Sequence, residues 1–135
     1  SAEFLQFAAM VEVENARHAM AQGKSPAALL AAADALITRA LKENAADAAT
    51  FYTAADLYRL RGDDDHALEA IDRSIAIDKE KSESHGLRGE LLLRRAQPAQ
   101  ALAEIDRAIQ LKPGSHWRWT EARAEALSKS TIYKR

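Results

Sequence analysis

The chain has 135 residues, which is long enough for one domain with a hydrophobic core and short for two. The 19 Lys and Arg residues are balanced by 20 Asp and Glu, so no positive surplus favours nucleic acid or an anionic membrane as a partner. The chain has no cysteine, which excludes disulfides and thiolate metal sites and favours a cytoplasmic location.

Helix-favouring residues dominate the chain, because Ala, Leu, Glu and Arg abound and glycine and proline number only 5 and 3. Breakers and capping residues divide the sequence at QGKSP, ENAAD, RGDDD, DKEKSES, AQP and KPGSH. Seven helices are predicted, at residues 3–22, 26–43, 47–61, 64–78, 82–95, 98–111 and 115–128. Ser25 is expected to cap the second helix with Pro26 at its first position, and Asp63 or Asp64 to cap the fourth. Connections this short predict antiparallel neighbours.

Two segments repeat with a spacing of 34 residues. ALEAIDRSIAID begins at Ala67 and ALAEIDRAIQLK begins at Ala101, and the two agree at 6 of 12 positions. Residues 48–81 align with residues 82–115 without a gap, helix on helix and turn on turn. A period of this length with two helices per unit is typical of a helical repeat protein, in which stacked hairpins share one core.

The residue pattern of these units resembles the tetratricopeptide repeat (TPR) family. The second unit carries the small, bulky and closing residues of the family pattern at Gly89, Leu92, Ala101, Ala108 and Pro113. The first unit matches with Phe51, Ala55, Tyr58, Ala67 and Ile71, and departs from the pattern with Ser74 and Lys79. Small residues at these places let helix backbones cross closely while bulky ones fill the gaps beside them.

The resemblance implies an all-α fold, a right-handed α-solenoid of about seven antiparallel helices, within a single domain covering residues 1–135. Residues 3–44 are expected to form a divergent, lengthened hairpin, and 48–81 and 82–115 the two repeats. A capping helix is predicted at 116–130, followed by an unstructured tail at 131–135. The opening residues SAEFLQFAAM have neither a starting methionine nor a basic signal region, so we expect the chain to be part of a longer protein. The segment AMAQGKSPAALLAAADAL also resembles repeat segments appended to bacterial serine/threonine kinases and other large regulators, which implies a bacterial protein.

The sequence predicts no catalytic residues, no cofactor and no metal site. The four histidines, at positions 18, 66, 85 and 116, include no pair at metal-ligand spacing, and GDDD at 62–65 lacks the pattern of a calcium loop. Glycine-rich nucleotide loops and the kinase motifs HRD and DFG are also absent. We therefore expect a chain that is not an enzyme by itself.

Recognition of a protein or peptide is the function that the resemblance implies, with the partner lying in a concave groove formed by the first helices of successive repeats. The groove positions carried over to this sequence are Tyr52, Thr53, Asp56, Arg59, Glu83, Gly86, Leu87, Glu90, Arg94, Trp117, Thr120 and Glu121. The strongest candidates for binding energy are Tyr52, Arg59, Arg94 and Trp117, because aromatic and arginine side chains dominate interfaces. The alternative is that Tyr52 and Trp117 pack between helices and that Arg59 forms a solvated ion pair with Glu90.

The sequence also bears on three other roles. The clamp that holds chaperone tails in related repeats needs basic residues where this chain has Asp56 and Glu121, so we expect no binding of such a tail. Self-association is the structural alternative, through an apolar set at the N-terminus made of Phe4, Leu5, Phe7, Val11 and Val13. The third role is that of an accessory, substrate-selecting region of a bacterial serine/threonine kinase or another enzyme.

Overall fold

The computed structural model describes residues 1–43 and 47–133, with side chains up to residue 130. All regular structure in these residues is helical, so the predicted all-α class is confirmed. Contacts group the chain into two compact units, Ser1–Ile77 (unit 1) and Asp78–Arg135 (unit 2). The single domain predicted from the sequence stays a prediction.

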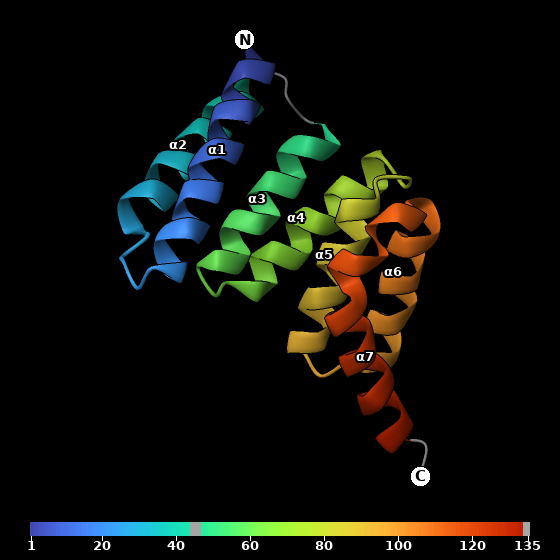
Figure 1. Cartoon of the computed structure of the whole chain (residues 1–135). Helices are drawn as coiled ribbons and strands as arrows, with labels where there is room; N and C mark the ends of the chain where they lie inside the picture. The colour runs from blue at the N-terminus through green and yellow to red at the C-terminus, as the bar shows by residue number, and fades with distance from the viewer. Residues whose placement is uncertain (44–46, 134–135) are drawn as a thin grey trace. The chain divides into compact units, whose positions relative to one another are not determined.

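Unit 1 holds two helical hairpins, with α1 at Ala2–Ala21, α2 at Ala27–Lys42, α3 at Ala48–Leu60 and α4 at Asp64–Ile77. Helix α1 packs on α2, and α3 packs on α4, as Figure 1 shows. Helix α3 also contacts both α1 and α2. The first helix of the second hairpin therefore stacks on the whole of the first hairpin.

Unit 2 repeats this arrangement with one helix fewer. It contains α5 at Ser82–Arg94, α6 at Pro98–Leu111, a 3₁₀ turn at Pro113–Ser115 and α7 at His116–Tyr133. Helices α5 and α6 form a hairpin, and α7 packs on both of them (Figure 1). Helix α7 thus takes the stacking position in unit 2 that α3 takes in unit 1.

The seven predicted helices agree with the structure to within two residues at every end except the last. Helix α7 continues to Tyr133, beyond the predicted end at 128, so the prediction of an unstructured tail is wrong for residues 131–133. Residues 134–135 of that tail, and Asn44 at the end of the predicted first hairpin, lie outside the described residues. Helix α1 has 20 residues and α2 has 16, whereas α3 has 13 and α4 has 14. The helices of the first hairpin are thus longer than those of the second, as the sequence predicts.

The 34-residue period is kept by the backbone. Helices α3 and α5 begin at residues 48 and 82 and end at 60 and 94, while α4 and α6 span 64–77 and 98–111. The hairpin turns match as well, because Asp63 N–H donates to the Tyr58 carbonyl and Gln97 N–H donates to the Leu92 carbonyl, both at 2.9 Å. The residue before each donor is left-handed, with φ +79° at Gly62 and φ +57° at Ala96. This hydrogen-bonded helix end usually requires glycine, so Ala96 is the strained member of the pair.

Two predicted caps have different outcomes. Asp63 accepts a hydrogen bond from His66 N–H at 3.2 Å, which confirms it as the cap of α4. The second helix begins at Ala27, one residue later than predicted, with Pro26 in the cap position. The Ser25 hydroxyl accepts only from the first helical N–H, that of Ala27, at 3.3 Å, so its predicted position as the helix cap is wrong by one residue.

Small residues lie at the crossings of the helix pairs. In unit 1, Ala9, Ala16, Ala33 and Ala40 are fully buried between α1 and α2. In unit 2, a Cβ added at Gly89 would meet Ile105 Cγ1 at 2.7 Å and the Ala101 carbonyl oxygen at 3.2 Å. Ser74, which departs from the family pattern, is fully buried and donates to the Ala48 carbonyl at 2.8 Å. This hydrogen bond satisfies a hydroxyl at a position where Ala108 stands in the next repeat.

Candidate functional site

The predicted groove residues are divided between the two units. Helix α3 of unit 1 carries Tyr52, Asp56 and Arg59. Helices α5 and α7 of unit 2 carry Glu90, Arg94, Trp117 and Glu121. Each set is therefore treated within its own unit.

Asp56 is the centre of an ion-pair cluster that joins α1 to α3. The residue is only 5% exposed, and its Oδ1 accepts from Arg59 at 2.9 Å and from Arg17 Nη1 at 3.3 Å. Arg17 also donates to Asp56 Oδ2 and, at 3.0 Å, to Glu14. Burial lowers the pKa of Arg17, but the hydrogen bonds and charges of Asp56 and Glu14 outweigh it and leave that pKa raised. Arg17 is therefore charged at neutral pH.

These contacts change the expected role of the α3 residues. Asp56 and Arg59 already pair with each other, so contact with a partner would require the cluster to open. Thr53 is buried as well and accepts a hydrogen bond from Gln6 at 3.3 Å, which is a second polar link between α1 and α3. Arg17 and Arg59 balance the charge of Asp56. Of the two acidic residues expected to repel the carboxylate of a chaperone tail, Glu121 is therefore the one that still supports that prediction.

The unit 2 residues are more open. Trp117 is 73% exposed, so it does not pack between helices. Arg94 and Glu121 are exposed and Glu90 is half-buried, whereas Gly86 and Leu87 are buried. The exposed indole is the observation in this set that points most directly to a partner, because a large apolar surface is left in water.

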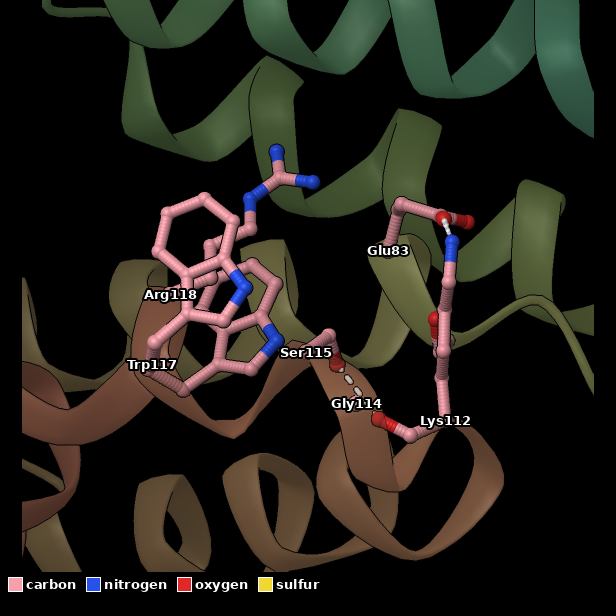
Figure 2. Close-up of a pocket in the computed structure, with 8 residues that line it drawn as sticks. Glu83, Lys112, Gly114, Ser115, Trp117 and Arg118 are labelled. Carbon is pink, nitrogen blue, oxygen red and sulfur yellow. Dashed lines mark hydrogen bonds and ion pairs between the residues drawn. The ribbon is translucent and has the colours of Figure 1, made fainter.

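A pocket of about 230 Å³ lies beside Trp117, between the start of α5 and the turn that leads into α7. Its lining residues are Ser82, Glu83, Lys112, Gly114, Ser115, Trp117, Arg118 and Trp119. Figure 2 shows the Lys112 side chain reaching the Glu83 carboxylate, with Trp117 and Arg118 on the other side of the pocket. The Ser115 hydroxyl donates to the Lys112 carbonyl at 2.6 Å, which fixes the turn below them.

Glu83 is the acidic group of this pocket. Its carboxylate lies 3.6 Å from Lys112 Nζ and 3.7 Å from Lys81 Nζ. Burial raises the pKa of Glu83, but a hydrogen bond from its own backbone N–H and the charges of the two lysines lower it further than burial raises it. Glu83 is therefore ionised at neutral pH and holds both lysine ammonium groups nearby.

Trp119 forms the packed side of the pocket. It is 2% exposed and belongs to a core with Leu92, Ala101 and Ile105. The Arg118 guanidinium carbon lies 4.9 Å from the centre of its ring. A Cβ added at Gly86 would come within 2.2 Å of the ring, so α5 needs glycine where the indole rests on it. Gly86, one of the predicted groove positions, thus serves packing.

His85 is held inside unit 2. It is 7% exposed, with Nε2 at 2.7 Å from the Lys79 carbonyl oxygen and Nδ1 at 2.9 Å from Glu104 Oε2. The imidazole therefore links α5 to α6 and to the turn before α5. Within residues 1–43 and 47–133, no group of three His, Cys, Asp or Glu side chains could hold a metal ion.

The N-terminal apolar set divides into two faces of α1. Leu5 and Val13 are 5% and 1% exposed, and Leu5 packs with Ala40 of α2. Phe4, Phe7 and Val11 are 67%, 57% and 38% exposed. Their spacing of three and four residues places them along one stripe of the helix. Two of the five predicted residues thus belong to the core and three remain on the surface.

Comparison with known proteins gives one relative and one structure of note. No protein-family model matches the chain. Over 64 residues the chain is 38% identical to anaphase-promoting complex subunit 7 of Dictyostelium discoideum, a TPR-containing subunit. The aligned region covers 47% of this chain but only 11% of that protein. The crystal structure of MamA, a TPR-like protein, aligns with 93% of this chain and 80% of its own at a TM-score of 0.58 and 14% identity. The fold is TPR-like.

The relative is named as a subunit of a complex, and the chain spans only about a tenth of its length. Among the described residues, none of the helices combines the length and the apolar character that crossing a bilayer demands. The cytoplasmic location and the bacterial origin stay predictions.

The sequence expectations did not include the cations of the pocket. Lys112 was expected in a turn and Arg118 had no expected role, although Arg118 stands between the two tryptophans of HWRWT and Lys112 lies five residues before the first of them. Arg17 was also missed, because only tertiary contact brings α1 next to α3. The local signal that could have found the pocket is the alternation of tryptophan and arginine at 117–119, directly after a basic turn.

Proposed function

We propose that this chain is a non-catalytic protein-interaction module that binds a peptide or helix of a partner through the first helices of its TPR-like hairpins. The partner-binding residues proposed are Tyr52, Asp56, Arg59, Glu90, Arg94, Trp117 and Glu121. One observation carries the proposal, which is the 73% exposure of Trp117 on the first turn of α7. Tryptophan and arginine are the side chains that most often dominate interface energy.

The residues of unit 1 and those of unit 2 support this proposal to different degrees. Trp117, Arg94 and Glu121 are exposed in unit 2 and are open to contact with a partner. Asp56 and Arg59 would contact it only at the cost of their own ion pair, so we expect them to contribute less. Unit 2 is therefore the better place to test the function.

Affinity capture with charge reversals tests the proposal. The first variant combines Arg94→Glu with Glu121→Lys, and the second is Trp117→Ala. The matched control exchanges an exposed ion pair on α4, Glu69→Lys with Arg73→Glu, whose charges lie 3.9 Å apart. We expect proteins captured by the wild-type chain to be lost with both first-helix variants and kept with the control. If every captured protein survives both variants, the first helices do not bind partners.

A second candidate function is self-association through α1. The exposed stripe of Phe4, Phe7 and Val11 is the observation that favours it, because two aromatic rings in water form an apolar patch rarely left uncovered. Light scattering should then give a mass above 14.8 kDa that rises with concentration, and Phe4→Ser with Phe7→Ser should restore the single-chain mass. A single-chain mass for the wild type at high concentration rejects this candidate. The role as an accessory region of a bacterial kinase stays a prediction.

A further inference from the structure

A buried histidine of unit 2 lies between two hydrogen-bond acceptors. The Nε2 of His85 is 2.7 Å from the carbonyl oxygen of Lys79, and its Nδ1 is 2.9 Å from Oε2 of Glu104. A carbonyl oxygen and an ionised carboxylate accept hydrogen bonds and have no proton to donate. Both contacts are therefore hydrogen bonds only when each ring nitrogen carries a proton, which is the imidazolium form.

The carboxylate of Glu104 balances a positive charge on this ring. One of its oxygens contacts His85, and the other lies 3.7 Å from Arg88, one turn further along α5. Helix α7 meets α5 at Gly86 through the uncharged indole of Trp119. Charged residues reach this part of α5 from several segments, and they are Lys79, Lys81, Glu83, Arg88, Glu104 and Lys112. Glu83 pairs with the two lysines at positions 81 and 112, so Glu104 is the carboxylate that pairs with the ring.

The two contacts of the ring respond differently when it loses one proton. A neutral imidazole keeps a single N–H, and a hydrogen bond to a carboxylate is stronger than one to a neutral carbonyl. The remaining proton therefore stays on Nδ1, facing Glu104. Nε2 then turns a lone pair toward the Lys79 carbonyl oxygen 2.7 Å away, and two acceptors at this distance repel each other. The contact with Lys79 is thus the one that breaks.

The Lys79 carbonyl belongs to the turn that leads into α5. Asp78, Lys79 and Glu80 are exposed, and α5 begins at Ser82 without a hydrogen bond from a capping side chain. Within the turn, the Glu80 N–H donates to the Asp78 carboxylate at 3.0 Å. The imidazole of His85 therefore ties an exposed turn to the packed helices α5 and α6.

We propose that His85 is a pH-sensitive clip on the turn before α5. The doubly protonated ring holds the Lys79 carbonyl, and the ring that has lost one proton releases it while keeping its bond to Glu104. The stability that this contact contributes is present below the titration of the ring and is lost as the pH rises through it. The inference goes beyond the proposed function and does not depend on any partner.

Nuclear magnetic resonance of the ring and of the carbonyl tests the clip. The whole chain, labelled with ¹³C and ¹⁵N, is titrated from about pH 5 to about pH 9, above the range of carboxylates and below that of lysines. At the acid end both nitrogens of His85 should carry protons, and at the alkaline end Nδ1 alone should carry one. The ¹³C shift of the Lys79 carbonyl should change with the same midpoint as the ring. It should not follow the ring of His116, which is exposed.

The variant Glu104→Gln distinguishes a clip from a contact that is merely structural. The glutamine amide donates to Nδ1, so the neutral ring keeps its proton on Nε2 and its bond to Lys79. The step in the Lys79 carbonyl shift should therefore be lost across the titration. The matched control is Glu125→Gln, the same change at an exposed residue of α7, and it should keep the step. If Glu104→Gln does not fold, the titration of the wild type decides alone.

Four results would overturn the inference. A ring protonated only on Nε2 at the acid end would place the shared proton on Glu104. A ring that keeps both protons to the alkaline end would show that no release occurs in this range. A Lys79 carbonyl shift that does not follow the ring would show that the turn is not what the ring holds. A step that persists in Glu104→Gln would remove the carboxylate as its cause.

Discussion

The hairpins α3–α4 and α5–α6 are two copies of one backbone with different attachments. Their helices begin and end at matching residues, and their turns carry the same hydrogen bonds. The neighbours are attached differently, because α3 is linked to α1 by ion pairs around Asp56, whereas α7 is held on α5 by Trp119 resting on Gly86. The repeat period thus specifies the hairpin. A few side chains outside the repeat pattern decide how the neighbouring helix, α1 or α7, is attached to it.

The two attachments also leave different surfaces. In unit 1, the polar groups of α1 and α3 satisfy one another, so that Asp56 and Thr53 are buried. In unit 2, the aromatic attachment leaves the cations Lys112 and Arg118 at the rim of a pocket. Unit 1 therefore joins its helices through buried polar groups, and unit 2 holds α7 through an aromatic ring. Four experiments test this difference.

The largest effect is expected from Trp119→Ala. Removing a fully packed indole leaves a cavity in unit 2 and should lower the free energy of unfolding by about 3–5 kcal/mol. The matched control is Trp117→Ala, only two residues away, where the exposed side chain should change stability by less than about 0.5 kcal/mol. Urea unfolding followed by circular dichroism measures both. Similar losses for the two variants would show that Trp119 does not hold α7 on its hairpin.

A smaller effect is expected from Asp56→Asn. The change removes the charge that two arginines share, and it should cost about 1–2 kcal/mol, less than for a fully buried pair because Arg17 and Arg59 are partly exposed to solvent. Glu90→Gln, the same change at the matching position of α5, is the control and should cost less. Hydrogen exchange of α1 amides should increase only in the Asp56 variant. Equal protection of α1 in both would contradict an ionic attachment.

The turns allow a reciprocal exchange. Gly62→Ala should destabilise the protein by about 1 kcal/mol, because alanine is strained at a φ of +79°. Ala96→Gly should stabilise it by a few tenths to about 1 kcal/mol, because it relieves strain at a φ of +57°. Melting temperatures of the two variants should therefore shift in opposite directions. A shift of the same sign in both would show that the two turns are not equivalent.

The smallest effect concerns acid stability and Glu83. The pKa of Glu83 is lower in the folded chain than in the unfolded chain, so the group stabilises the fold above its unfolded pKa of about 4.3. This contribution is lost as the pH falls below that value and the folded carboxylate takes up a proton. Glu83→Gln should therefore flatten the fall in stability between about pH 5 and pH 3, with an effect below about 1 kcal/mol. An unchanged pH profile in the variant would remove the lysine pairing as its cause.

Most of the backbone could be predicted from the sequence. The helix ends follow from local chemistry, such as Asp63 at a cap and glycine in a turn, and the pairing of helices follows from short connections and the 34-residue period. The departure from the family pattern at Ser74 is accommodated within one hairpin, since its buried hydroxyl donates to the carbonyl of Ala48, which lies 26 residues earlier. These features depend on residues that are close in sequence or repeat at a fixed distance.

The candidate site could be predicted only in part. Trp117 followed from its position on a first helix, but the burial of Asp56 did not, because Arg17 lies 39 residues away along the chain. The pocket lined by Lys112, Arg118 and Trp119 depends on the indole of Trp119 packing on Gly86, a contact between α7 and α5 that the repeat period does not indicate. Sequence by itself determined the helices, their order and their hairpins, since these depend on local hydrogen bonds and on apolar spacing. Tertiary structure alone decided that Asp56 pairs with Arg17 and that Trp119 packs on Gly86, because these side chains meet only after the helices stack.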